Sequence, residues 1–356
     1  MVTGGSGFIG SSVVRNFLQV EGHDVLNLDK LTYATNPDNL ADVSNHPRYH
    51  FLRADIGNSD LLATAFRDFS PDAVLHLAAE SHVDRSIDQP ADFILTNIVG
   101  SYKLLEAALA YYETLPGERA QRFRFIHVST DEVFGSLADD AHPFGLDTPY
   151  DPRSPYSASK AASDHIARAW QHTYGLPVIV TNCSNNYGPY QFPEKFIPLL
   201  IINCLQGRKL PLYGNGSNIR DWLFVEDHCK ALQLVLEKGK PGATYMFGGE
   251  AEHSNLDTAM FICEILDRIK PISGNGSYAD LIEFVEDRPG HDHRYAIDIS
   301  ESRSDIGWSP ATGFRDGLEK TVGWYLENQG WWQNIMDRGS HTERQGLSRM
   351  RTNLGA

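Results

Sequence analysis

A short polar run near the middle of the chain, followed by a tyrosine and a lysine, contains the side chains best suited to proton and hydride transfer. Thr130, Asp131 and Glu132 are consecutive, and Tyr156 and Lys160 follow four residues apart. On a helix, that spacing places the phenol and the ammonium on one face. A nearby ammonium favours the phenolate, which can accept a proton from an alcohol while a hydride leaves the same carbon.

The adjacent carboxylates of Asp131 and Glu132 predict a second kind of chemistry. One carboxylate can remove a carbon-bound proton while the other, in its acid form, protonates a departing hydroxyl, and a dehydration needs both steps. Acidic pairs are common in solvated loops, but this pair follows an apolar run at residues 123–128. Strands of a doubly wound sheet end at the ligand crevice, so we expect both carboxylates to lie there.

A glycine-rich turn at residues 3–10 predicts a dinucleotide site. Gly4, Gly7 and Gly10 recur every three residues before an amphipathic stretch. Such a turn lets a pyrophosphate approach the backbone and the positive end of a helix. Asp29, at the end of the next strand-like run, suits the ribose hydroxyls of adenosine. Its carboxylate would repel a 2′-phosphate, and Lys30 alone is no phosphate clamp, so the pattern favours NAD over NADP.

The elements that must position these groups alternate along the chain. Strand-like runs at residues 24–29, 49–53, 73–77, 123–128 and 178–181 are separated by stretches of helical length, with helices expected at 10–20, 59–69, 90–112 and 157–174. Alternation of this kind predicts an α/β fold with a doubly wound parallel sheet of the Rossmann type. The chain begins only two residues before the glycine turn, so the usual first strand is almost absent, and we interpret the recorded start as truncated.

Composition excludes several classes of protein. The chain has 356 residues, 41% of them hydrophobic, and a formal net charge of −15, which disfavours a nucleic-acid partner. The four cysteines are far apart without a Cys-x-x-Cys spacing, which predicts buried free thiols, no metal site and a reducing compartment. We identify neither a signal peptide nor an apolar run of the roughly 20 residues that span a bilayer, so we expect a soluble cytoplasmic protein without a membrane partner.

These pieces together resemble the extended short-chain dehydrogenase/reductases, and more closely the dTDP-glucose 4,6-dehydratases. The matching segments are residues 3–10, 77–86, 130–135, 156–160, 185–195, 220–227 and 287–291, and the resemblance extends to about Trp332. The first and fourth segments are typical of the whole superfamily. The Asp-Glu pair and the segments around it occur in a much smaller part of the superfamily.

The resemblance implies an order of reaction for the family's nucleotide-sugar substrate. Tyr156, aided by Lys160 and Thr130, would be the base for oxidation at C4 of the glucose, and the new ketone would acidify the C5 proton. Glu132 would remove that proton while Asp131 protonates the C6 hydroxyl, so that water leaves. The hydride held by NAD would then return to C6 as C5 is reprotonated, giving a 4-keto-6-deoxy sugar.

The resemblance also assigns the binding residues, which extend beyond those that the residue patterns predict. Around NAD we expect Gly4, Gly7, Phe8, Ile9, Gly10, Asp29, Lys30, Leu31, Thr32, Asp55, Ile56, Leu77, Ala78, Ala79, Ser81, Thr96, Tyr156, Lys160 and Asn186. Around the nucleotide sugar we expect Ser81, Thr130, Asn185, Lys195, Phe196, Pro211, Tyr213, Arg220, Asn255, Asp287, Arg288 and His291. The two arginines in this set suit a diphosphate, because guanidinium groups pair with its oxygens bidentately.

Residues 1–184 would form the NAD-binding Rossmann domain. Residues 185–335 would form a smaller, interwoven domain that mainly binds the nucleotide sugar, with some segments returning to the sheet, and residues 336–356 a partly disordered tail. The family also implies a homodimer through the helices at residues 90–112 and 157–174.

Three alternatives remain open at this point. A UDP-sugar 4-epimerase or a decarboxylase of the same fold would need Tyr156 and Lys160 but not both carboxylates. A 4,6-dehydratase acting on UDP- or CDP-glucose would use the same residues. The nucleobase is recognised by loops whose positions cannot be predicted from the sequence. A non-catalytic dinucleotide-sensing protein would have little use for Tyr156, Lys160, Asp131 and Glu132 together.

Overall fold

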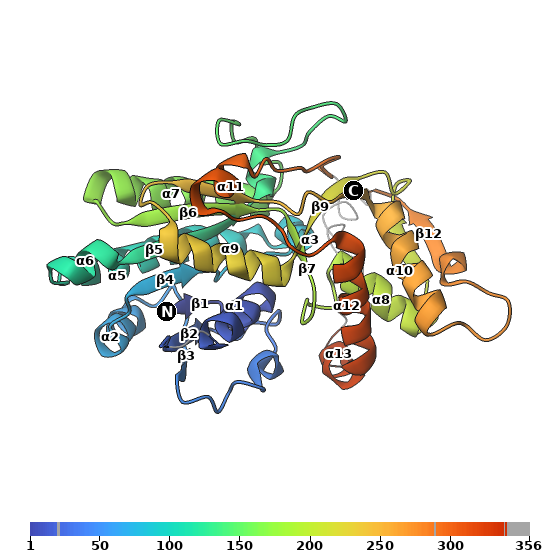
Figure 1. The fold of residues 1–356 in the computed structure, drawn as a ribbon, viewed down its shortest axis with the longest axis horizontal. Helices are drawn as coiled ribbons and strands as arrows, with labels where there is room; N and C mark the ends of the chain where they lie inside the picture. The colour runs from blue at the N-terminus through green and yellow to red at the C-terminus, as the bar shows by residue number, and fades with distance from the viewer. Residues whose placement is uncertain (20–21, 288–289, 338, 340–356) are drawn as a thin grey trace, which may run out of the picture.

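The computed structural model describes residues 1–19, 22–287, 290–337 and 339, and its central feature is a parallel sheet of seven strands (Figure 1). The strand order is β10-β6-β5-β4-β1-β2-β3, and every neighbouring pair is parallel. The strands are β1 (Val2–Thr3), β2 (Val25–Asp29), β3 (Tyr49–Arg53), β4 (Ala73–His76), β5 (Arg124–Thr130), β6 (Val178–Cys183) and β10 (Thr244–Phe247). The predicted doubly wound α/β fold is confirmed.

The first strand is as short as the sequence indicates, yet it lies inside the sheet. Val2 pairs with Asn27 of β2 on one side and with Leu75 of β4 on the other. The chain then leaves the sheet at Gly4, so the glycine turn begins at the carboxyl end of an inner strand. This placement brings the turn next to the ends of β2 and β4, where a doubly wound sheet binds its ligand.

Helices cover both faces of the sheet, and the side chains of each strand alternate between them. In β5, Ile126 and Val128 belong to an apolar cluster with the first group of helices, whereas Phe125 belongs to a cluster with the second group. The first group is α1 (Phe8–Gln19), α9 (Val225–Lys238) and α11 (Ser300–Ile306). The second group is α2 (Ser59–Phe69), α5 (Ser101–Tyr112) and α7 (Pro155–Tyr174).

The C-terminal part of the chain forms a further apolar cluster beside the sheet, with Trp332 and Tyr187 fully buried in it. Figure 1 shows its helices gathered at one side of the molecule. They are α8 (Phe196–Leu205), α10 (Asn255–Ile269), α12 (Phe314–Glu327) and α13 (Gln329–Asp337). The accompanying strands are β7 (Asn185–Tyr187), β8 (Leu210–Tyr213), β9 (Ile219–Phe224), β11 (Glu252–Ser254) and β12 (Ile282–Val285), in two small sheets.

The helix expected at residues 90–112 is present but is not a uniform α-helix. It consists of α4 (Pro90–Phe93), a π-helical segment η2 (Ile94–Gly100) and α5. By length and composition it is apolar enough to cross a membrane, contrary to the expectation that no such run exists. This is weak evidence for a membrane span, because a core helix of a globular protein passes the same test, and α5 packs against α2 and α7.

The four cysteines are buried free thiols, as predicted. Cys183 ends β6, Cys229 lies in α9, and Cys204 and Cys263 lie in the C-terminal cluster. Of the tail expected at residues 336–356, Met336 and Asp337 end α13, and residues 338 and 340–356 lie outside the described residues. The remaining α-helices of the described residues are the short α3 (Val83–Asp88) and α6 (Gly117–Arg122).

Candidate active site

The glycine turn and Asp29 form one end of a cavity of about 300 Å³ at the carboxyl edge of the sheet. Gly4 has a φ of +72°, and a Cβ there would lie 2.7 Å from the backbone nitrogen of Ala78. Asp29 accepts hydrogen bonds from the backbone N–H groups of Ser6, at 3.0 Å, and Leu31, at 2.8 Å. Only glycine fits at this position of the turn, because a side chain at Gly4 would collide with the loop after β4.

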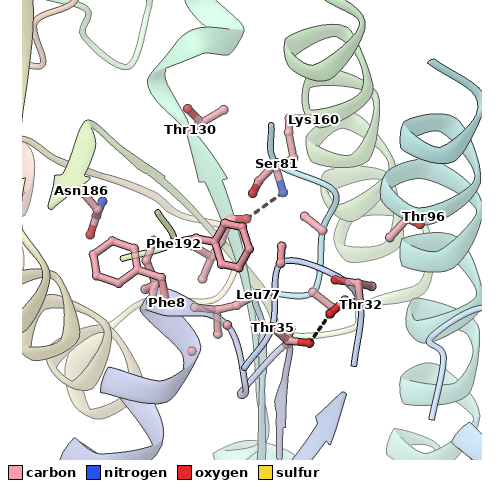
Figure 2. Close-up of a pocket in the computed structure, with 18 of the residues that line it drawn as sticks. Phe8, Thr32, Thr35, Leu77, Ser81, Thr96, Thr130, Lys160, Asn186 and Phe192 are labelled. Carbon is pink, nitrogen blue, oxygen red and sulfur yellow. Dashed lines mark hydrogen bonds between the residues drawn. The ribbon is translucent and has the colours of Figure 1, made fainter. Parts of the chain in front are cut away.

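Nearly all the residues expected around NAD line this first cavity, and Figure 2 shows how they converge from separate elements. Thr130 and Lys160 lie toward one end, and Thr32 and Thr35 toward the other. Leu31 and Asp55 are exceptions, because neither is among the lining residues. Leu31 instead donates its backbone N–H to Asp29, and Asp55 accepts the backbone N–H of Gly57 at 2.7 Å.

The tyrosine and the lysine enter the same cavity from the first turns of α7. Ser154 caps this helix through a reciprocal capping box with Ser157, and Pro155 follows at the first helical position, which together fix where the helix begins. Tyr156 and Lys160 both line the cavity. Lys160 donates its ammonium to the carbonyl of Val128 in β5, at 2.8 Å, so the helix is tied to the strand that precedes the two carboxylates.

The charge environment of Tyr156 differs from the sequence-based expectation. Burial raises the pKa of the phenol well above its ordinary value, and the charge of Glu132 adds to the effect, whereas a hydrogen bond with Thr130 opposes it. Burial and the neighbouring carboxylates therefore oppose the effect that we expect from the Lys160 ammonium, which favours the phenolate. The physical reason is that a fully buried phenol loses its hydration and lies close to two carboxylates.

Asp131 and Glu132 diverge because β5 ends at Thr130 and a single 3₁₀ turn, η3 (Asp131–Phe134), follows it. Glu132 lines the first cavity, but Asp131 is 1% exposed and lines neither cavity described here. Asp131 Oδ1 accepts a hydrogen bond from the Thr130 hydroxyl at 3.2 Å, while its Oδ2 is buried without a partner among the described residues. Burial, followed by the charges of Glu132 and Asp221, raises the pKa of Asp131 well above its ordinary value. The group is therefore held as an acid.

A second cavity, of about 460 Å³, opens on the far side of Glu132. The two cavities share a small set of lining residues: Ser81, Glu132, Asn185, Asn186, Gln191, Glu194 and Lys195. The second cavity is also lined by most of the residues expected around the nucleotide sugar: Phe196, Pro211, Tyr213, Arg220, Asn255 and His291. The chain thus brings two binding spaces together at a shared wall that contains two carboxylates, Glu132 and Glu194.

Arg220 and the segment at 287–291 supply the polar wall of the second cavity. Arg220 is 7% exposed, and its guanidinium donates to the carbonyls of Ile219 and Asp292 at 2.7 and 3.0 Å. His291 lines the cavity and pairs through its ring with Asp287, at 2.6 Å. Asp287 itself is not a lining residue, and Arg288 lies outside the described residues.

The sequence analysis missed several residues that line one or both cavities. Gln191, Phe192 and Glu194 fall inside the matched segment 185–195, so that segment could have identified them. Trp222 likewise falls inside the matched segment 220–227. Tyr295 lines the second cavity but carried no signal, because an isolated tyrosine in a loop-rich region has no pattern around it.

Comparisons with known proteins agree with this geometry. A family model described as GDP-mannose 4,6 dehydratase matches residues 1–321. The dTDP-glucose 4,6-dehydratase of Neisseria meningitidis is 54% identical, over 98% of this chain and 99% of its own. The solved structure of DesIV, a dTDP-glucose 4,6-dehydratase from Streptomyces venezuelae with NAD and TYD bound, has a TM-score of 0.85 and 44% identity, covering 94% and 98% of the two chains.

Epimerases of the same fold are more distant. The UDP-glucose 4-epimerase of Thermotoga maritima has a TM-score of 0.81 but only 26% identity, over 92% of this chain and 98% of its own. The fold is thus common to several activities, and the higher identity distinguishes among them. The chain belongs to the dTDP-glucose 4,6-dehydratases, a family of extended short-chain dehydrogenase/reductases.

Proposed function

We propose that this chain is an NAD-dependent hydro-lyase that converts dTDP-glucose to dTDP-4-keto-6-deoxyglucose. One observation carries the proposal: Glu132 lines both cavities, and Tyr156 and Lys160 line the first of them. A base for a carbon-bound proton is thereby next to the groups that oxidise an alcohol. The high identity to dTDP-glucose 4,6-dehydratases over nearly the full chain supports the substrate.

The first cavity fits NAD. Gly4, Gly7 and Gly10 line it, and the first turn of α1 carries no acidic residue that would repel a pyrophosphate. Asp29 presents a carboxylate to the ribose hydroxyls from the end of β2. When bound, NAD supplies the hydride acceptor for oxidation at C4 and the hydride donor for reduction at C6.

The residues of the chain move the protons. The phenolate form of Tyr156, favoured by the Lys160 ammonium one helical turn away, takes the proton of the C4 hydroxyl. Glu132 then removes the C5 proton that the new ketone has acidified, and it returns that proton to C5 when C6 is reduced. Asp131, held in its acid form by burial and by its anionic neighbours, donates a proton to the C6 hydroxyl as water leaves. Asp131 lines neither cavity, so this step requires a rearrangement of the η3 turn that brings the carboxyl group to the C6 hydroxyl.

The experiment is a product assay across nucleotide-glucose donors. Purified protein is incubated with dTDP-, UDP- and CDP-glucose, and the alkali-sensitive absorbance of a 4-keto sugar is followed. We expect turnover with dTDP-glucose and loss of the C6 hydroxyl in the isolated product. Formation of a galactose isomer would instead identify an epimerase, and no turnover with any donor would contradict the enzyme assignment.

We further propose a homodimer built on α4, η2, α5 and α7. Large apolar side chains are exposed along these helices, with Ile94 50%, Leu95 60%, Tyr102 42% and Tyr174 53% exposed. The ring of Tyr102 lies 5.7 Å from that of Trp170, which joins the helices into one apolar face. A contiguous patch of this kind marks an interface, and light scattering should give twice the 39.8 kDa mass of the chain. Leu95→Asp should halve the mass, and a monomeric wild type would contradict the proposal.

We also propose a cytoplasmic location for this protein. All four cysteines are free and buried, which suits a reducing compartment. Fractionation of cells that express the full chain, with activity assayed in each fraction, tests the location.

A further inference from the structure

Beneath Lys160 lies a buried carboxylate that the proposed reaction does not use. Asp164 is one helical turn after Lys160 in α7, and its side chain is fully buried. The two residues share a face of the helix with Tyr156, because all three are spaced by four. A buried charge is costly unless it is paired and hydrogen-bonded. The groups around Asp164 therefore indicate its role.

Asp164 is held by neutral donors from three separate elements. Ser129 in β5 and Tyr150 in the preceding loop donate to Oδ2, each at 2.9 Å, and Asn182 in β6 donates to the same oxygen at 3.3 Å. Oδ1 lies 3.1 Å from Nε2 of His127 in β5. Asn182 also donates to the carbonyl of Thr130, at 2.9 Å, so the network reaches the start of the catalytic turn.

His127 does not supply the positive charge that would balance Asp164. Burial, followed by the charge of Lys160, lowers the pKa of the imidazole, so the ring is neutral and donates its Nε2–H. Its Nδ1 is buried without a partner among the described residues, which agrees with that tautomer. His76 in β4, whose ring lies 5.3 Å from that of His127, is also neutral, because burial lowers its pKa well below the ordinary value.

The remaining charged groups are Lys160 and Arg168. Arg168, one turn further along α7, is half-buried and donates to the Tyr150 hydroxyl at 2.9 Å rather than to Asp164. Lys160 is fully buried and donates only to the carbonyl of Val128 among the described residues. Burial lowers the pKa of Lys160, and the charge of Asp164 is the largest effect that opposes it.

We propose that Asp164 is a positioning residue for C4 oxidation, acting as the buried counter-charge of Lys160 and fastening the ends of β5 and β6 to α7. It lines neither of the two cavities. Without its charge, Lys160 would lose its proton more easily, and the cation beside Tyr156 would disappear as the pH rises. The inference rests on the proposed function, because it assigns Asp164 to the oxidation step of that reaction.

The test is the pH dependence of C4 oxidation in Asp164→Asn, followed in single turnovers as absorbance of the reduced cofactor. Asparagine keeps the size and one acceptor oxygen but removes the charge. We expect the rate to fall by about 10- to 100-fold at neutral pH, and the decline at high pH to begin at a lower pH than in the wild type. The KM for dTDP-glucose should be unchanged.

Tyr150→Phe is the matched control, because it removes one hydrogen bond to the same carboxylate and leaves the charge. Its pH profile should match that of the wild type. A profile in Asp164→Asn that is uniformly lowered, with no shift along the pH axis, would overturn the proposal and leave a structural role only. Absence of turnover in the wild type would instead contradict the proposed function, so the two failures are distinguishable.

A second variant covers the case in which Asp164→Asn does not fold. The double variant Lys160→Met/Asp164→Asn removes both charges, so no uncompensated ammonium stays buried. We expect the double variant to show the cooperative thermal unfolding transition that Asp164→Asn then lacks. A double variant that also fails to fold would overturn the proposed charge pair.

Discussion

Asp131→Asn is the sharpest perturbation of the elimination step. The substitution preserves size and keeps Oδ1 as an acceptor for the Thr130 hydroxyl, so the η3 turn should be retained. It removes the proton that the proposed mechanism delivers to the C6 hydroxyl. A general acid contributes about 10²- to 10⁴-fold to a rate, so elimination should slow by that factor, or about 3–5 kcal/mol of transition-state stabilisation.

The order of steps makes this loss visible. Oxidation at C4 depends on Tyr156, Lys160 and Thr130 and should proceed, so the reduced cofactor should accumulate and absorb near its usual wavelength. Glu132 remains able to remove the C5 proton, so the trapped sugar should exchange that proton with deuterated solvent. Glu132→Gln is the matched comparison, because it should also accumulate reduced cofactor but show no exchange.

Stability provides an independent check with a definite sign. Burial raises the pKa of Asp131 in the folded protein. This group therefore favours folding at low pH, and it destabilises the protein as the pH rises above the pKa that the carboxyl group has in the unfolded chain. Asp131→Asn should therefore raise the melting temperature at pH 8 more than at pH 5. Near-normal turnover in Asp131→Asn, or reduced cofactor that fails to accumulate, would refute the assignment of the acid.

Three further predictions concern binding. Gly4→Ala should purify with little NAD, because the new Cβ would lie 2.7 Å from the nitrogen of Ala78 at a φ of +72°, and cofactor released by denaturation measures this. Asp29→Asn should weaken NAD binding by about 10- to 100-fold and reduce the ratio of the affinity for NAD to the affinity for NADP. Titration of the cofactor-free protein with each dinucleotide measures this ratio, and an unchanged ratio would argue against ribose recognition by Asp29. Arg220→Lys should raise the KM for dTDP-glucose by about tenfold or more without changing the NAD content, because a lysine cannot pair bidentately with a diphosphate.

Local pattern was enough to predict much of the fold. The strand β3 and the helix α2 have the predicted bounds, and the other predicted strands differ by one or two residues at their ends. These elements were predictable because hydrophobic periodicity and turn residues act over short distances along the chain. The helix at residues 90–112 was predicted in place but not in form, because it contains the π segment η2.

The residue types and spacings along the chain by themselves determined the chemistry of the site: a glycine turn, a strand-end carboxylate, a tyrosine–lysine pair and two adjacent acids. Tertiary structure alone decided how these groups are charged and what they face. It placed Glu132 at the junction of two cavities, buried Asp131 as an acid, raised the pKa of Tyr156 and set Asp164 beneath Lys160. The physical reason is that periodicity is local, whereas desolvation and charge–charge interactions depend on neighbours brought together only by folding.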